Sequence, residues 1–143
     1  MDSKYDCLKL SNQLCFPLYA ASRKIVKAYT PYLKPLGLTY TQYITLMVLW
    51  EEPEVKIKDL GSKLFLDTGT LTPLLKKMED EGLVTRTRSR VDERVVNIKI
   101  TEKGMAYREK CLEIPEKMGC CLHISEDEVK ALYKGLYDIL NEE

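Results

Sequence analysis

The spacing of apolar and polar residues along the chain predicts several amphipathic helices and one pair of strands. The first helix is expected over residues 11–33, with Pro17 either in its first turn or at a kink. Pro31, Pro35 and Gly37 are expected to end this segment. The apolar side of the helix is formed by Leu14, Leu18, Tyr19, Ile25, Val26 and Tyr29.

Capping signals mark the starts of three further helices, at Thr39, Thr101 and Ser125. These helices are expected over residues 40–50, over residues 102 to about 113, and from residue 126 onward. Between the last two, Pro115 and Gly119 are expected to loosen the chain. The last helix carries one apolar face, which consists of Val129, Leu132, Leu136 and Leu140.

The stretch from residue 57 to residue 101 predicts a helix-turn-helix followed by a β-hairpin. Residues 57–64 have the apolar spacing of a short helix, residues 65–69 form a turn with a cap signal, and residues 70–81 form the second helix. Gly82 stops that helix. Residues 83–90 and 94–100 then alternate as two strands joined through residues 91–93. A helix of this size fits the major groove of DNA, and an arginine-rich hairpin beside it can reach phosphates or the minor groove.

Several polar residues of this stretch are candidates for contacts with phosphates or base edges. In the second helix and the turn before it they are Thr68, Thr70, Thr72, Lys76 and Lys77, and in the hairpin they are Arg86, Arg88, Arg90 and Arg94. A small α+β domain without any DNA target can show the same pattern, and a surface Lys or Arg is usually only solvated. DNA binding is nevertheless the favoured interpretation.

The predicted fold class is α+β, mainly α, in a single winged helix-turn-helix domain over residues 1–143. Residues 55–101 carry the helix-turn-helix and the wing, and residues 1–38 and 102–143 carry flanking helices. One short reading helix binds weakly by itself, so a two-fold dimer on a pseudo-palindromic operator is expected, with the flanking helices as the dimer interface. The alternative is that these helices close the core of a monomer.

The distribution of charge supports this arrangement better than the total does. The chain has 22 basic and 22 acidic residues, but residues 1–101 contain 16 basic and 12 acidic residues, whereas residues 102–143 contain 6 and 10. The positive excess therefore lies with the predicted DNA reader. The longest apolar run is far too short to span a membrane, and no signal-peptide core begins the chain. A cytoplasmic protein is expected, and five cysteines without regular spacing fit a reducing compartment.

Two motifs in the central stretch resemble the MarR family of winged-helix repressors. Asp92-Glu93-Arg94 looks like the D-x-R motif of the MarR wing, and residues 98–104 look like its "L-T-x-x-G" exit. Together with residues 66–79, they resemble the OhrR branch, which senses organic hydroperoxides, and the match runs from about Leu14 to Gly104. The resemblance implies that Arg94 reaches DNA while Asp92 stabilises the tip of the wing.

The same resemblance gives Cys15 a chemical role. Residues 14–19 look like the segment that holds the reactive cysteine of OhrR proteins, and Tyr19 and Tyr29 match the tyrosines around its thiolate. On a helix Cys15, Tyr19 and Tyr29 share one face, yet Cys15 and Tyr29 are about 21 Å apart at ~1.5 Å per residue. If two copies of the helix cross antiparallel about Ser22, Tyr29 of one meets Cys15 of the other and can donate a hydrogen bond to the thiolate. Without the resemblance, a cysteine on an apolar helix face is more often an inert small side chain.

Cys120 and Cys121 are candidates for the resolving thiol, because two-cysteine members of the family use a cysteine from the partner's C-terminal region. One-cysteine members use a low-molecular-weight thiol instead, and the sequence leaves this choice open. Together with His123, the two cysteines lack the spacing of a structural zinc site, so no metal is expected. No cofactor is expected either.

The predicted function is therefore a homodimeric repressor that leaves double-stranded DNA when an organic hydroperoxide oxidises Cys15. The nearest alternative is a MarR-type repressor that is released by a non-covalent aromatic ligand, with Cys15 as a bystander. An enzyme, namely a thiol peroxidase, is disfavoured because Cys15 lacks a Thr-x-x-Cys environment and has no arginine nearer in sequence than Arg23.

Overall fold

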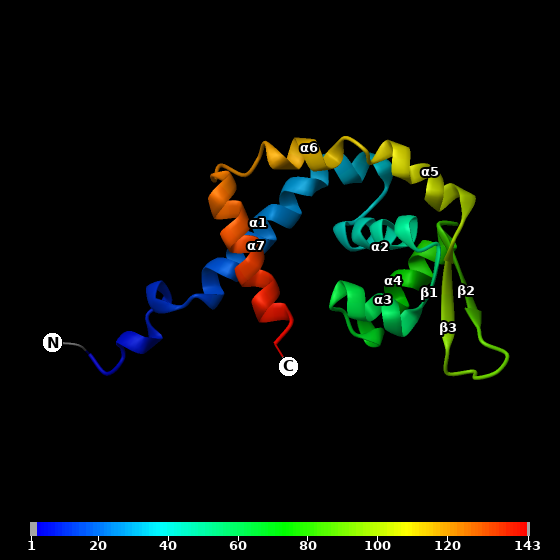
Figure 1. The fold of residues 1–143 in the computed structure, drawn as a ribbon, viewed down its shortest axis with the longest axis horizontal. Coiled ribbons are helices and arrows are strands. Elements are labelled where there is room, and N and C mark those ends of the chain that lie inside the picture. The colour runs from blue at the N-terminus through cyan, green and yellow to red at the C-terminus, as the bar shows by residue number, and fades with distance from the viewer. Residues whose placement is uncertain (1–2, 143) are drawn as a thin grey trace. The chain divides into compact units, whose positions relative to one another are not determined.

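The computed structural model describes residues 3–142, and it is mainly helical with one small antiparallel sheet (Figure 1). The chain divides into two compact units, one up to Tyr40 and the other from Thr41 onward. The helices are α1 (Cys15–Leu33), α2 (Tyr40–Glu51), α3 (Ile57–Leu64), α4 (Thr68–Asp80), α5 (Glu102–Lys110), α6 (Ile114–Gly119) and α7 (Glu126–Leu140). The strands are β1 (Glu54–Lys56), β2 (Val84–Arg88) and β3 (Val96–Ile100), and the short 3-10 helices are η1 (Asp6–Leu8), η2 (Leu10–Asn12) and η3 (Lys34–Leu36).

Helix α1 dominates the first unit, and its start differs from the earliest predicted one, whereas its C-terminal end matches the prediction. The helix begins at Cys15, four residues later than the earliest predicted start, so Pro17 lies in its first turn, where a missing N–H costs least. The helix ends at Leu33, as predicted, with Pro31 inside its last turn. Only one hydrogen bond of the last turn is lost at Pro31. The segment ends after η3 at Gly37, whose φ of 71° is left-handed.

The second unit contains the helix-turn-helix. Helix α3 has the predicted bounds, whereas α4 begins at Thr68, two residues before the predicted start. The reason is Asp67, whose carbonyl accepts the backbone N–H of Thr70 and whose carboxylate accepts the Thr70 hydroxyl. The turn between the helices places Phe65 in the left-handed region, at φ 54°.

The sheet has the order β1-β3-β2, with both pairings antiparallel. The predicted hairpin is present, but its strands are shorter than expected, because residues 89–95 fold into turns closed by bonds such as that from the Ser89 N–H to the Val95 carbonyl. Strand β1 was not predicted from the sequence. It pairs Val55 opposite Ile98 and adds a third strand beside the wing.

Two of the three C-terminal helices were predicted in part. Thr101 caps α5 by accepting the N–H of Gly104, but α5 ends at Lys110 rather than near residue 113. The expectation that residues 115–119 are loose is wrong: they belong to α6, where Pro115 lies in the first turn. Helix α7 begins with the predicted capping box, in which Ser125 and Glu128 each accept the other's backbone N–H.

The core of the second unit lies between the sheet and the helices α2, α3 and α4. Its fully buried side chains include Leu46, Leu49, Leu60, Leu71, Leu75, Met78 and Ile98. The indole N–H of Trp50 in α2 donates to the carbonyl of Gly104 in α5 at 3.0 Å. By contrast, no residue of α7 is buried, so its apolar face does not close the core of a single chain. Among the described residues, no helix combines the length and apolar character needed to cross a bilayer.

Candidate DNA-binding surface and redox site

Helix α4 presents one polar face to solvent and buries the other. Leu71, Leu75 and Met78 are buried against the core. The five predicted contact residues of this helix are all exposed, as a reading helix requires: Thr68, Thr70, Thr72, Lys76 and Lys77.

The hydroxyl donors on this face are not all available for a ligand. The Thr70 hydroxyl donates to the Asp67 carboxylate, and the Thr72 hydroxyl donates to the Thr68 carbonyl at 2.8 Å. The bond from Thr70 holds the pKa of Asp67 below its usual value, helped by neighbouring backbone N–H groups. The hydroxyl oxygens of both threonines can still accept hydrogen bonds, and the ammonium groups of Lys76 and Lys77 are exposed donors.

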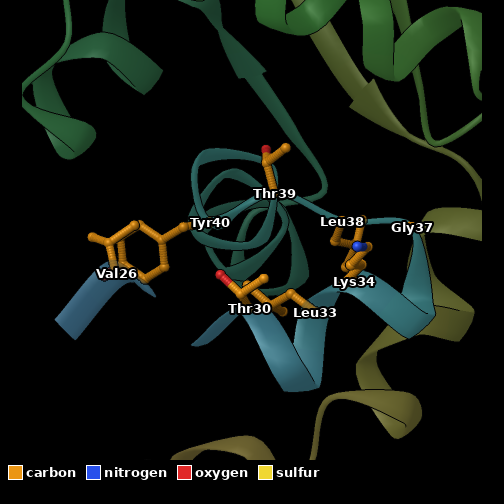
Figure 2. A pocket seen from close by; sticks show the side chains of 8 residues that line it. All are labelled: Val26, Thr30, Leu33, Lys34, Gly37, Leu38, Thr39 and Tyr40. Atoms are coloured by element: carbon orange, nitrogen blue, oxygen red, sulfur yellow. The ribbon is translucent and has the colours of Figure 1, made fainter. Parts of the chain in front are cut away.

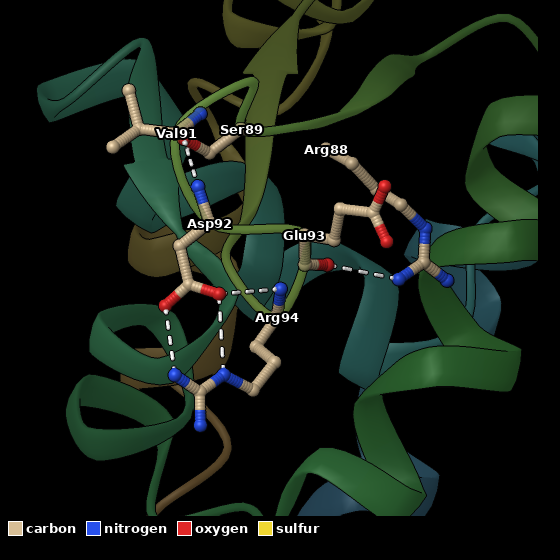
Figure 3. Close-up of polar contacts among 6 residues, drawn as sticks. All are labelled: Arg88, Ser89, Val91, Asp92, Glu93 and Arg94. Atoms are coloured by element: carbon tan, nitrogen blue, oxygen red, sulfur yellow. Dashed lines mark hydrogen bonds and ion pairs between the residues drawn. The ribbon is translucent and has the colours of Figure 1, made fainter.

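Asp92 and Arg94 form the tip of the wing (Figure 3). The Asp92 carboxylate accepts the Arg94 backbone N–H at 3.0 Å and its Nε at 3.2 Å. The backbone N–H is the main cause of a lowered Asp92 pKa, with the guanidinium second. The Arg94 side chain is nevertheless 91% exposed. The aspartate therefore fixes the turn while most of the arginine remains accessible.

The other three wing arginines differ in how they are held. Arg88 donates from Nη1 to the Glu93 carbonyl at 3.0 Å, across the base of the loop (Figure 3). Arg86 is half-buried against the carboxylate of Glu79 in α4. Arg90 is exposed and makes no hydrogen bond or ion pair with any residue in the range 3–142. The role of Glu79 was not predicted, because nothing in the sequence signals a pairing between a helix residue and a strand residue seven positions later.

Cys15 is the first residue of α1 and is exposed. Tyr19, one turn further along, is also exposed, and the guanidinium of Arg23 lies over its ring at 5.4 Å. Tyr29 lies in the same helix, fourteen residues from Cys15. Because the helix is continuous between them, the structure keeps the predicted separation of about 21 Å within one chain.

Tyr29 is half-buried and packs on Tyr40, with ring centroids 4.8 Å apart and an interplanar angle of 50°. Burial raises the pKa of Tyr29, and the neighbouring Tyr40 adds to this effect. The phenol therefore stays protonated well above neutral pH, so its hydroxyl can act as a donor.

The other cysteines lie in different surroundings. Cys120 and Cys121 follow α6 and are exposed, and the Cys121 thiol donates to the Lys117 carbonyl at 3.4 Å. Cys111 is buried, and this burial raises its pKa. Cys7 is exposed in the N-terminal segment. Thus both predicted resolving thiols are accessible in a single chain, and Cys111 is not.

A pocket of about 390 Å³ lies within the first unit, at the C-terminal end of α1 (Figure 2). Its lining comes from α1, from η3 and the following turn, and from the first residue of α2. The lining residues are Val26, Thr30, Leu33, Lys34, Gly37, Leu38, Thr39 and Tyr40. Most of this lining is apolar, with one lysine at its edge.

Comparisons with known proteins find transcriptional regulators that are similar to this chain. Residues 27–111 match the family model described as transcriptional regulator SarA/Rot. The organic hydroperoxide resistance transcriptional regulator of Bacillus subtilis is 47% identical over 98% of this chain and 95% of its own length. The HTH-type transcriptional regulator SarZ of Staphylococcus aureus is 46% identical over 92% and 89%.

Solved structures of AbfR, a protein of Staphylococcus epidermidis, are also similar. The reduced form bound to DNA superposes with a TM-score of 0.78 at 37% identity, covering 96% of each chain. A disulfide form gives a TM-score of 0.65 at 35% identity, covering 96% of this chain and 97% of the other. The predicted fold class is thereby confirmed.

Proposed function

The chain belongs to the SarA/Rot family of transcriptional regulators, with the winged-helix fold of MarR-type regulators, and we propose that it represses transcription as a homodimer until an organic hydroperoxide oxidises Cys15. The observation that carries this proposal is the exposed Cys15 at the start of α1 in a chain 47% identical to a hydroperoxide resistance regulator. The chain is a DNA-binding regulator and not an enzyme, as predicted from the sequence, because the matching family model and the relatives are transcriptional regulators.

On DNA, α4 would lie in the major groove and the wing would follow the adjacent backbone or minor groove. Lys76 and Lys77 supply charge along α4, and Arg94 supplies it at the wing tip, where Asp92 fixes the backbone. The structure of reduced AbfR bound to DNA supports binding of DNA by the reduced form of this chain. A dimer would place two such readers about one turn of DNA apart, on a pseudo-palindromic operator.

The dimer interface is proposed to involve the flanking helices. The apolar face of α7 remains exposed in the single chain, with Val129, Leu132, Leu136 and Leu140 all between 37% and 48% accessible. The exposed face of α1 contains both Cys15 and Tyr19. An antiparallel crossing of two α1 helices would bring Tyr29 of the partner to Cys15 across the two-fold axis.

The sensing step is a two-electron oxidation. The Cys15 thiolate attacks the terminal oxygen of the hydroperoxide, an S–O bond forms, the O–O bond breaks, and the organic residue leaves as an alcohol after taking a proton. The product is a sulfenic acid. A second thiol then attacks its sulfur, a disulfide forms, and the oxygen leaves as water. The hydroxyl of Tyr29, and that of Tyr19, would support the thiolate before oxidation by donating hydrogen bonds.

We propose that the second thiol is Cys120 or Cys121 of the other subunit, with a low-molecular-weight thiol as the alternative. Both cysteines are exposed, and a structure of the relative AbfR in a disulfide form is known. Replacing a packed thiolate with a disulfide would shift the dimer helices and so change the distance between the two readers. Such thiol chemistry requires a reducing compartment, and we therefore place the protein in the cytoplasm.

A gel-shift titration with cumene hydroperoxide tests the sensing residue. The Cys15→Ser variant should bind the operator but remain bound at doses that release the parent, because serine is of similar size and has, in place of the thiol, a hydroxyl, which the hydroperoxide cannot oxidise. Cys7→Ser, which removes another exposed thiol, is the control and should respond like the parent. Release of Cys15→Ser at the parental dose would show that Cys15 is not the sensor.

A second candidate function, release by a non-covalent aromatic ligand, has the mainly apolar 390 Å³ pocket of the first unit in its favour. Its lining residues include Tyr40, whose ring can stack on an aromatic molecule, and Lys34, which can pair with an acidic group (Figure 2). A gel-shift titration of Cys15→Ser with a phenolic compound decides between the two. Release of Cys15→Ser by a phenolic compound, with no change in thiol content, would support this candidate.

A further inference from the structure

Glu79 of α4 holds both the backbone and the side chain of Arg86 in β2. One carboxylate oxygen accepts the Arg86 backbone N–H at 2.8 Å, and the other accepts Nε and Nη2, both at 3.3 Å. The side chains of the pair are only 27% and 35% exposed, for Arg86 and Glu79 respectively. The ion pair between Arg94 and Asp92 at the wing tip is far more exposed to solvent, since the Arg94 side chain is 91% exposed.

The backbone bond has a clear structural role. Strand β2 lies at the edge of the sheet, so the amides that point away from β3 have no strand to accept them. Arg86 lies opposite Ile98 on β3, but its backbone N–H donates to Glu79. The backbone N–H of Arg86 therefore points away from β3, and the two residues form a non-hydrogen-bonded pair of the antiparallel ladder. The carboxylate takes the place of a carbonyl on a missing neighbouring strand. It thereby fastens the wing to the last turns of the reading helix.

The side-chain bonds have an electrostatic consequence. The Glu79 carboxylate compensates the positive charge of the Arg86 guanidinium. An arginine whose charge is compensated within the protein does not displace counterions from DNA. A small hollow of about 160 Å³ lies beside the pair, lined by Glu79, Arg86, Thr87, Arg88 and Val96. If the carboxylate were absent, the guanidinium could turn through this space and reach a phosphate.

We propose that Glu79 is a positioning and specificity-determining residue, which sets the wing against the reading helix and withholds Arg86 from the DNA backbone. This inference rests on the proposed binding of DNA by α4 and the wing. It assigns Arg86 a structural role and leaves Arg94 and the lysines of α4 to contact phosphates. Specificity benefits because the wing stays in register with the helix, and because one source of sequence-independent affinity is suppressed.

The test compares Glu79→Gln with Glu81→Gln. Both variants remove one negative charge from the C-terminal end of α4, but Glu81 accepts from Gln42 rather than from an arginine, so only the first variant frees a cation. For Glu79→Gln, binding to random-sequence duplex should strengthen, and the slope of log K against log salt should steepen by about 0.9 for each phosphate gained. The ratio of operator affinity to random-sequence affinity should fall about tenfold or more. Glu81→Gln should show no steepening.

Arg86 variants separate the two parts of the proposal. Arg86→Gln should leave the salt slope at the parental value, and the double variant Glu79→Gln, Arg86→Gln should lose the steepening while keeping the loss of specificity. A flatter slope in Arg86→Gln would mean that Arg86 already contacts a phosphate, and it would overturn the proposal. So would identical salt slopes and affinity ratios for Glu79→Gln and Glu81→Gln.

A measurement without DNA keeps this inference separate from the proposed function. In Glu79→Ala, hydrogen exchange of the Arg86 amide should accelerate at least tenfold, while the amides of Thr85 and Thr87, which face β3, should change much less. Unchanged exchange at Arg86 would overturn the fastening role. Failure of the parent protein to bind DNA would instead refute the proposed function and leave the exchange result standing.

Discussion

At the wing, arginines that look equivalent in sequence are held by different acceptors. Arg86 bonds to a carboxylate of the reading helix, Arg88 bonds to a carbonyl of the loop, and Arg94 bonds to Asp92 at the tip. If α4 and the wing bind DNA as proposed, these acceptors determine which of the arginines a phosphate can reach. The pair formed by Arg94 is exposed, and exposed ion pairs contribute little to stability, so a phosphate can replace the aspartate at little cost.

Arg94→Ala should therefore weaken operator binding without affecting folding. Each lost phosphate contact removes about 0.9 from the slope of log K against log salt, so the line should become flatter. The measurement is an operator titration at several salt concentrations, with Lys4→Ala as a variant that loses the same charge from the N-terminal segment. If the Arg94→Ala line coincided with that of the parent, the wing tip would not touch DNA.

The candidate residues could be identified from sequence wherever a short motif carried the information. Asp92 and Arg94 are two positions apart, so their mutual contact follows from local turn geometry. The contact between Glu79 and Arg86 depends on how a helix packs beside a strand, and no local rule encodes that packing. Likewise, the bond from the Thr72 hydroxyl to the Thr68 carbonyl removes a donor that the sequence alone made appear available.

At the level of the elements, those with strong local signals were predicted best. Helix α3 has a regular apolar stripe, and α7 has a complete capping box, so their starts match the prediction. Strand β1 has three residues and is stable only because β3 pairs with it, and α6 has six residues and is stabilised by burial of Ile114 and Met118. Such short elements depend on tertiary contacts, which a periodicity argument does not contain.

The helix-turn-helix depends on one close approach, at Gly61 of α3. A Cβ atom on Gly61 would lie 2.6 Å from the Leu66 carbonyl oxygen and 3.2 Å from Cδ1 of Leu71. Gly61→Ala should therefore separate α3 from the turn and lower the free energy of unfolding by about 2 kcal/mol, in the range for overpacked sites. Chemical denaturation measures this loss, and operator affinity should fall with it.

Gly135→Ala in α7 is the matched control. A Cβ atom there has no other atom within 4 Å, and alanine is favoured over glycine in a helix by about 1 kcal/mol. This variant should be as stable as the parent or slightly more stable. Equal stability of Gly61→Ala and the parent would show that the turn can move aside, and the proposed constraint on the reading helix would be wrong.

At the level of the whole molecule, the exposed apolar face of α7 and the exposed cysteines suggest dimerisation and disulfide formation, both of which need a second chain. Tyr29 lies about 21 Å from Cys15 along one helix, so any support of the thiolate by Tyr29 must come from a second chain. Tyr29→Phe should then require more hydroperoxide, or more time, for release from the operator. The hydroxyl that donates to the thiolate would be missing, and less of the reactive form would be present.

The route by which oxidised Cys15 is resolved can be read from the covalent state of the dimer. If Cys120 or Cys121 of the partner attacks the sulfenic acid, brief treatment with cumene hydroperoxide should give a dimer band on a non-reducing gel, and dithiothreitol should abolish it. Cys15→Ser should give no band, and Cys7→Ser should give the parental amount. The double variant Cys120→Ser, Cys121→Ser should lose the band but keep oxidation at Cys15, measured as a sulfenic acid adduct or a mixed disulfide with a small thiol.

If the double variant cross-links as well as the parent, neither cysteine is the resolving thiol. Because Cys111 is buried and its pKa is raised, that result would leave the exposed Cys7 as the next cysteine to replace.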